Sequence, residues 1–179
     1  MPPENARAAL DLVLSRPATL GAGRLLAIDG PSGSGKTTLA AGIAELAPSC
    51  TVIHLDDLYA GWSGLPQLTE SLGGLLRPLA SGNPGHFRCY DWHADDWAED
   101  VCVSPTELLV VEGVGSGSRE FADLITALVW LDVSPEVGLA RALDRDGTAY
   151  EEQLRAWQRD EAMHYAVDAT RERADIVLG

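Results

Sequence analysis

Short apolar runs alternate with segments of helical periodicity along this chain of 179 residues. Consecutive apolar residues that end at a turn or an acid are typical of buried strands, and apolar residues recurring every three or four positions are typical of helices. Strands that are apolar throughout and alternate with helices indicate a parallel sheet covered on both faces. We therefore predict an α/β protein with five parallel strands flanked by helices. The predicted strands are 24–29, 51–55, 107–111, 127–133 and 174–178. The predicted helices are 5–15, 37–46, 68–79, 135–144 and 151–167.

The segment 59–106 departs from this pattern. It is rich in glycine, proline, tryptophan and histidine, and only 68–79 within it has helical periodicity. A long irregular stretch inside a compact domain is usually functional or mobile, and the plainer alternative is a loosely structured surface insertion. Because the segment begins and ends beside strands that carry carboxylates, we favour a functional insertion within a single domain, 1–179.

The charge of the chain limits its partners. There are 27 acidic and 13 basic side chains, so the formal net charge is −14. This argues against broad binding to nucleic acid or anionic membrane, which recruit basic patches. No apolar run approaches the roughly 20 residues that cross a bilayer, and residues 1–20 lack the pattern of a secretion signal. The three cysteines have no metal-type spacing and suit reduced thiols, so we expect a cytoplasmic protein.

Residues 30–37 read Gly-Pro-Ser-Gly-Ser-Gly-Lys-Thr and match G-x-x-x-x-G-K-[ST] at every fixed position. A predicted strand precedes them and a predicted helix follows, so a chance glycine-rich turn is the weaker interpretation. Such glycines let backbone N–H groups turn inward as an anion nest at a helix N-terminus. We expect Lys36 to reach the β- and γ-phosphates and the Thr37 hydroxyl to bind Mg²⁺. The expected nucleotide contacts are Gly30, Pro31, Ser32, Gly33, Ser34, Gly35, Lys36, Thr37 and Thr38.

Two carboxylates lie where predicted strands end. Asp56 follows the strand 51–55, and Glu112 follows 107–111. Ligands of parallel sheets bind at the carboxyl ends of the strands, so both acids should lie near the phosphate loop. Phosphoryl transfer needs one carboxylate to orient and deprotonate the acceptor hydroxyl and another in the metal shell. We assign Asp56 to the first role and Glu112 to the second; the alternative for Glu112 is a structural hydrogen bond to the loop after it.

Two arginines suggest a lid. Arg141 and Arg145 are four residues apart, so they share a helix face, and an Asp-Gly turn follows them. Arginines on a helix end that closes over a nucleotide stabilise charge on the transferring phosphoryl group. We predict a lid at about 141–150. The alternative is a pair of surface arginines forming ion pairs with Glu136 or Asp144.

Several side chains near the insertion are candidates for the acceptor site. Tyr90, Trp92, His93 and Trp97 are able to form an aromatic acceptor pocket, and the alternative is a helix face packed on the core. Arg119 is a candidate for contacting the acceptor or a phosphate. The equal alternative is that it is a charged residue on the surface.

One further cluster lies on the last long helix. Asp160, Glu161 and His164 resemble a metal cluster only loosely. A solvated helix face is the interpretation that we prefer.

The order of five short motifs resembles that of the uridine kinases, a family grouped with phosphoribulokinase and bacterial pantothenate kinase among P-loop kinases. The phosphate loop alone is shared by many NTPases, and the Asp-x-x-Tyr with the later Tyr-Asp and Glu-Gly is the more specific part. The resemblance spans 24–179. The motifs are 28–38 (IDGPSGSGKTT), 55–59 (LDDLY), 90–92 (YDW), 111–113 (VEG) and 174–177 (ADIV).

This resemblance implies a P-loop NTPase three-layer sandwich and a kinase that uses ATP and Mg²⁺. It implies that Asp56 is the base for a ribose 5′-hydroxyl, and that Thr37, Asp56 and Glu112 form the metal neighbourhood. It places Arg141 and Arg145 in the family's lid and Asp175 in the segment beside the adenine. With Arg119 from the argument above, the expected substrate-side residues are Asp56, Tyr59, Tyr90, His93, Glu112, Arg119 and Gln153.

The acceptor region departs from the family pattern. The acidic hairpin that grips the ribose hydroxyls has no counterpart in the interval from Asp56 to Tyr90, which is shorter here. We predict phosphoryl transfer to a small-molecule hydroxyl, with uridine or cytidine as the leading acceptor. The alternatives are a nucleoside monophosphate, which would need Arg77, Arg88 or Arg119, a sugar or vitamin precursor, or a non-catalytic nucleotide-binding switch.

Overall fold

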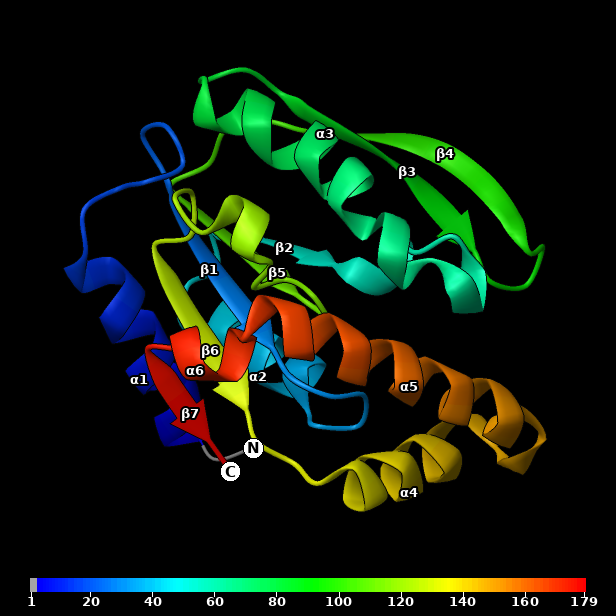
Figure 1. The fold of residues 1–179 in the computed structure, drawn as a ribbon. Helices are drawn as coiled ribbons and strands as arrows, with labels where there is room; N and C mark the ends of the chain where they lie inside the picture. Colours follow the sequence, from blue (N-terminus) through cyan, green and yellow to red (C-terminus); the bar gives the residue numbers. More distant parts are fainter. Residues whose placement is uncertain (1–2) are drawn as a thin grey trace.

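Five apolar runs form one parallel sheet in the computed structural model, which describes residues 3–179 (Figure 1). The sheet order is β2-β5-β1-β6-β7, and every pairing is parallel. All residues of β5 and β6 are buried, as expected for strands covered on both faces. The predicted five-stranded parallel sheet is confirmed. The strands are β1 (Arg24–Asp29), β2 (Thr51–His54), β5 (Leu108–Glu112), β6 (Ala127–Leu131) and β7 (Ile176–Leu178).

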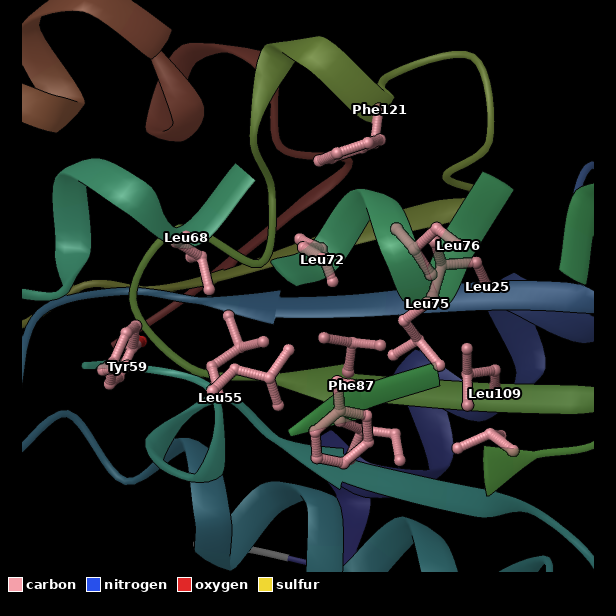
Figure 2. Close-up of a cluster of buried hydrophobic side chains, with 14 of the residues drawn as sticks. Leu25, Leu55, Tyr59, Leu68, Leu72, Leu75, Leu76, Phe87, Leu109 and Phe121 are labelled. Atoms are coloured by element: carbon pink, nitrogen blue, oxygen red, sulfur yellow. The ribbon is translucent and has the colours of Figure 1, made fainter. Parts of the chain in front are cut away.

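Helices cover both faces of this sheet, and the sheet divides the buried core into two main parts. Residues of α1 and α2 pack with one set of strand side chains, and residues of α3 and α5 pack with the other. Figure 2 shows Leu72 and Leu75 of α3 in one cluster with Leu25 and Leu109 of the sheet. The three predicted layers are therefore present. The helices are α1 (Pro3–Ser15), α2 (Lys36–Leu46), α3 (Leu68–Ala80), α4 (Pro135–Asp146), α5 (Glu151–Asp168) and α6 (Thr170–Arg173).

The insertion is more regular than the sequence suggests. After α3 the chain forms an antiparallel hairpin of β3 (Gly85–Asp91) and β4 (Asp96–Val103), which pack beside α3 (Figure 1). The expectation of irregular structure outside the helical piece was wrong. The signal was weak because Asp96, Glu99 and Asp100 of β4 are exposed and charged, and only Val101 and Val103 of this strand pack on the core.

Among residues 3–179, none of the helices combines the length and the apolar composition that a bilayer crossing requires.

Candidate active site

The phosphate loop lies at the centre of the sheet, between the end of β1 and the start of α2. Gly33 and Gly35 have φ values of 75° and 95°, a backbone region that glycine adopts without a side-chain clash. The Lys36 ammonium lies inside the loop, where it donates to the carbonyl oxygens of Gly30 (2.8 Å) and Pro31 (2.9 Å). The loop thus holds a positive charge beside the N-terminus of α2, where an anion is favoured.

A cavity of about 780 Å³ opens over this loop. Its walls come from four parts of the fold: the loop, the ends of β2 and β5, the α4–α5 pair, and the turn of the hairpin. The loop residues that line it are Ser32, Gly33, Gly35, Lys36, Thr37 and Thr38. The other lining residues are Asp56, Tyr59, Trp62, Trp92, His93, Glu112, Val114, Arg141, Arg145, Asp146, Tyr150, Leu154 and Trp157.

Glu112 is buried at the end of β5 and is held by two partners. Its Oε1 accepts a hydrogen bond from Thr37 Oγ1 (2.9 Å) and lies 2.6 Å from His54 Nδ1 on β2. The pairing of His54 with Glu112 follows from the parallel register of β2 and β5. The partners of this carboxylate are therefore side chains at the phosphate loop and on β2, rather than the loop after β5.

Asp56 lies in the short 3-10 turn Leu55–Asp57 after β2 and faces the same cavity. Its side chain is exposed to the cavity, and the protein around the cavity still removes enough water to raise the pKa of its carboxyl. The charge of Glu112 raises it further, and the charges of Lys36 and Arg145 lower it. Two carboxylates sharing one cavity favour a cation between or beside them.

The oxygen atoms here suit a hard cation. The Thr37 hydroxyl and the carboxylates of Glu112 and Asp56 are the ligand types that Mg²⁺ takes, commonly one or two carboxylates with phosphate and water completing the shell. No cluster of three or more His, Cys, Asp or Glu side chains poised to hold a metal exists within residues 3–179. A cation at this edge would therefore need ligands from a bound phosphate.

The predicted lid arginines lie at the wall of the cavity. Arg141 donates to the carbonyl oxygen of Gly33 on the loop (3.3 Å). Arg145 forms a two-contact pair with Asp146, both at 2.6 Å, instead of pairing with Glu136 or Asp144. The helix that carries them starts very close to the loop, because Gly138 packs on it without any side chain between them.

Aromatic rings form another part of the cavity wall, the aromatic wall. Trp62 contacts Trp92 (5.4 Å between ring centroids), Tyr150 (6.0 Å) and Trp157 (6.5 Å), so rings from four separate segments meet. The Trp92 indole donates to the backbone carbonyl of Asp56 (2.8 Å). Tyr59 is fully buried, with its hydroxyl on the carbonyl of Val114 (2.8 Å). An aromatic wall was anticipated at the hairpin; the contributions of Trp62, Tyr150 and Trp157 were missed.

Seven predicted contact residues are not among those that line the cavity, and four of these were expected beside the acceptor or the adenine. The Tyr90 hydroxyl donates to Asp95 (2.6 Å), which raises the pKa of Tyr90 to about 12, and its ring packs on Trp92 and Trp97. Arg119 is tied to Asp168 through its backbone N–H (3.0 Å) and its guanidinium (3.1 Å to the carbonyl). The remaining two residues are Gln153 and Asp175, of which Asp175 pairs with Arg16 (2.8 Å).

Other expected nucleotide residues contribute differently. Gly30 and Pro31 are present as the carbonyl partners of Lys36 rather than as lining residues. Ser34 lines a second, smaller cavity with Thr38, Asp132 and the end of β7.

Two buried acids that support the loop were not recognised from the sequence. Asp29 ends β1 and accepts hydrogen bonds from Gly115 N (3.0 Å), Gly117 N (2.8 Å) and the Tyr165 hydroxyl (2.8 Å); burial raises its pKa. The sequence signal for Asp29 is an acidic residue at the end of an apolar run, as it is for Glu112. Glu161 is buried against the phosphate loop, so a solvated helix face was wrong for this residue.

Comparison with known proteins gives a matching family model and individual relatives. Residues 68–178 match the family model described as the Phosphoribulokinase / Uridine kinase family. The uridine kinase of Borrelia garinii subsp. bavariensis is 24% identical over an alignment of 176 residues. The alignment covers 87% of this chain and 85% of that protein.

Solved structures show the same fold. A Bacillus stearothermophilus protein described as a possible uridine kinase superposes with a TM-score of 0.69 at 22% identity and 98% coverage of both chains. A Silicibacter sp. TM1040 protein described as a candidate fructose transport system kinase has a TM-score of 0.69 at 21% identity, covering 97% of this chain and 98% of that one.

Proposed function

We propose that this chain phosphorylates the 5′-hydroxyl of a pyrimidine nucleoside. The chain belongs to the phosphoribulokinase / uridine kinase family and is an ATP-dependent small-molecule kinase. The observation that carries the proposal is that two kinds of residue line one cavity. The loop, Lys36 and the arginines suit a phosphate, the aromatic rings suit a planar group, and Asp56 lines the same cavity.

The triphosphate is assigned to the loop side. Backbone N–H groups of the loop and the Lys36 ammonium supply positive potential for the β- and γ-phosphates. Thr37 and Glu112, with Asp56 nearby, are the residues that would hold Mg²⁺. When bound, Mg²⁺ neutralises charge on the phosphate oxygens. Arg141 and Arg145 face the same space and are assigned to stabilising the transferring phosphoryl group.

Asp56 is assigned as the general base. A base must lie within hydrogen-bond reach of the acceptor hydroxyl and must titrate near the working pH. Burial and the charge of Glu112 raise the pKa of Asp56 toward that range, while Lys36 and Arg145 keep its ionised form accessible. The carboxylate is thus able to orient the hydroxyl and take its proton as the phosphoryl group arrives.

The aromatic side argues for a neutral acceptor with a planar ring. The cavity-lining cations Lys36, Arg141 and Arg145 are assigned to the phosphates, and His93 lies with the aromatic rings. A phosphate or carboxylate on the acceptor would be desolvated without a partner there, which is costly. A planar base packs well on tryptophan and tyrosine rings.

The arginines that a monophosphate acceptor would need have other partners. Arg77 pairs with Glu120 (2.6 Å), and Arg88 lies over the Trp97 ring (5.8 Å) and near Asp100 (3.8 Å). Neither lines the cavity, nor does Arg119. This arrangement supports a nucleoside in preference to its monophosphate.

A panel of acceptors tests the proposal. ADP formation with ATP and Mg²⁺ is measured for uridine, cytidine, uridine monophosphate, fructose and a sugar acid, and the product is identified by phosphorus NMR. We expect kcat/KM for a pyrimidine nucleoside to exceed that for the charged or non-planar acceptors by about 100-fold or more. Preference for a phosphorylated, acidic or sugar acceptor would contradict the acceptor assignment. ATP binding with no acceptor-stimulated turnover would favour a nucleotide-binding switch.

A further inference from the structure

Glu161 is a buried carboxylate to which the proposed reaction gives no role. It lies on α5, far along the chain from the phosphate loop, and its side chain reaches Ser32 at the tip of the loop. Its Oε1 accepts a hydrogen bond from Ser32 N (2.9 Å) and another from Ser32 Oγ (2.6 Å). Only 4% of the residue is exposed. A carboxylate in such a place is costly unless its hydrogen bonds and a nearby cation compensate.

The geometry of the loop shows what this contact does. Lys36 holds the start of the loop from inside, through the carbonyl oxygens of Gly30 and Pro31. Asp29 holds the Gly30 N–H (2.7 Å) at the base. Glu161 holds the tip from the opposite side, because Ser32 points both its N–H and its hydroxyl toward α5. Both donors of Ser32 are therefore occupied by one carboxylate on α5.

Charge supports the same reading. Burial raises the pKa of Glu161, and the Ser32 hydrogen bonds and the positive charge of Lys36 lower it. The carboxylate thus compensates part of the Lys36 charge before a nucleotide is present. Trp157 lies one turn earlier on α5, and its ring lines the aromatic wall. Glu161 therefore stands between the acceptor wall and the phosphate loop.

We propose that Glu161 is a positioning residue for the triphosphate: through its two hydrogen bonds to Ser32 it holds the phosphate loop in its binding shape. The inference rests on ATP binding at this loop and not on the identity of the acceptor. It assigns Glu161 no contact with the substrate or the reacting atoms.

The test compares Glu161→Ala with Glu161→Gln. The glutamine carbonyl oxygen still accepts from Ser32, whereas alanine removes both hydrogen bonds. Glu152→Gln is the matched control, because Glu152 is an exposed acid in the first turn of the same helix. Two quantities are measured without any acceptor. One is the Kd of a non-hydrolysable ATP analogue with Mg²⁺, and the other is amide hydrogen exchange of residues 30–36 in the nucleotide-free protein.

For Glu161→Ala we expect the Kd to rise about tenfold and exchange at the loop tip to accelerate, because an unheld loop must be ordered upon binding. We expect Glu161→Gln to stay within about threefold of the wild type and Glu152→Gln to match it. An unchanged or lower Kd for a folded Glu161→Ala protein would overturn the proposal. So would a Glu161→Gln variant as impaired as Glu161→Ala, since charge rather than hydrogen bonding would then be responsible.

Ser32→Ala keeps the proposal falsifiable if Glu161→Ala does not fold. This variant removes one of the two donors and leaves the carboxylate in place, so we expect a smaller rise in Kd, about threefold. Amide exchange of residues 30–36 in the nucleotide-free Ser32→Ala protein should accelerate as well, because the loop loses part of its contact with α5. An unchanged Kd together with unchanged exchange would contradict the inference. Failure of the nucleoside assay leaves these nucleotide measurements unaffected, so the two proposals fail separately.

Discussion

The rings of Trp62 and Tyr150 are stacked, with centroids 6.0 Å apart and planes inclined by 30°. Trp62 lies in the 3-10 turn Gly61–Ser63, shortly after Asp56, and Tyr150 lies in the turn Thr148–Tyr150 that joins α4 to α5. The contact therefore joins the turn after Asp56 to the turn that follows Arg141 and Arg145. A planar acceptor that packs on Trp62 would also meet this segment.

Replacing Trp62 by leucine should weaken acceptor binding selectively. The leucine keeps an apolar side chain but loses the stacking surface, which is worth about 1 kcal/mol or more per aromatic pair. We expect the acceptor KM to rise about tenfold while the KM for ATP changes little. Steady-state kinetics with each substrate varied in turn provides the measurement. Trp97→Leu, which alters a hairpin tryptophan outside the cavity lining, is the control; equal effects of the two variants would argue against an acceptor role.

Lys36→Ala and Asp56→Asn should separate binding from transfer. Lys36→Ala removes the ammonium from the loop, so we expect loss of turnover and at least about tenfold weaker binding of an ATP analogue. Asp56→Asn removes the base, so we expect turnover to fall about 10²- to 10⁴-fold with nucleotide affinity nearly unchanged. Calorimetric titration and ADP formation measure the two properties. Asp57→Asn serves as the neighbouring control, and loss of ATP binding in Asp56→Asn would count against its assignment.

Asp56→Asn should also stabilise the nucleotide-free protein above the pH at which the carboxyl ionises. The folded-state pKa of Asp56 is raised, mainly by burial, so ionisation of this side chain disfavours the folded state as the pH rises from the unfolded pKa through the folded one. Asparagine stays neutral throughout. We expect Tm to increase at pH 8 and this gain to shrink near pH 4. Thermal denaturation across this range measures it, and a gain independent of pH would contradict the cause.

Arg145→Ala should move the acid limb of the pH–rate profile. The positive charge of Arg145 lowers the pKa of Asp56, so its removal should raise that pKa. We expect the acid limb of kcat/KM to move to higher pH, in addition to a lower maximal rate. Arg155→Ala is the control, because Arg155 pairs with Glu151 on the exposed part of α5 (2.8 Å). A lower rate with an unmoved limb would show that Arg145 does not act on the base.

Gly33→Ala should disrupt the contact between the phosphate loop and α4. A Cβ at Gly33 would lie 2.3 Å from the Gly138 carbonyl oxygen, so the loop or the helix must shift. Gly82→Ala is a matched control, since Gly82 has a similar φ of 78° against 75° and nothing within 4 Å of the added atom. Both variants place an alanine at a positive φ, which costs about 1 kcal/mol in backbone strain. We expect only Gly33→Ala to weaken ATP-analogue binding, measured as Kd, and equal losses would remove the steric argument.

The sequence by itself determined the sheet, the phosphate loop and the two acids at strand ends. These features are local: apolar runs define the strands, and the glycine spacing defines the loop. Glu112 ends β5 and Asp56 lies in the turn after β2, two strands whose carboxyl ends share one edge. The tertiary structure decided the rest. Trp62, Tyr150 and Trp157 form one wall because segments distant in the chain meet, and Glu161 is buried because α5 packs against the loop. Neither feature has a local pattern, since burial of a single side chain depends on which surface its helix meets.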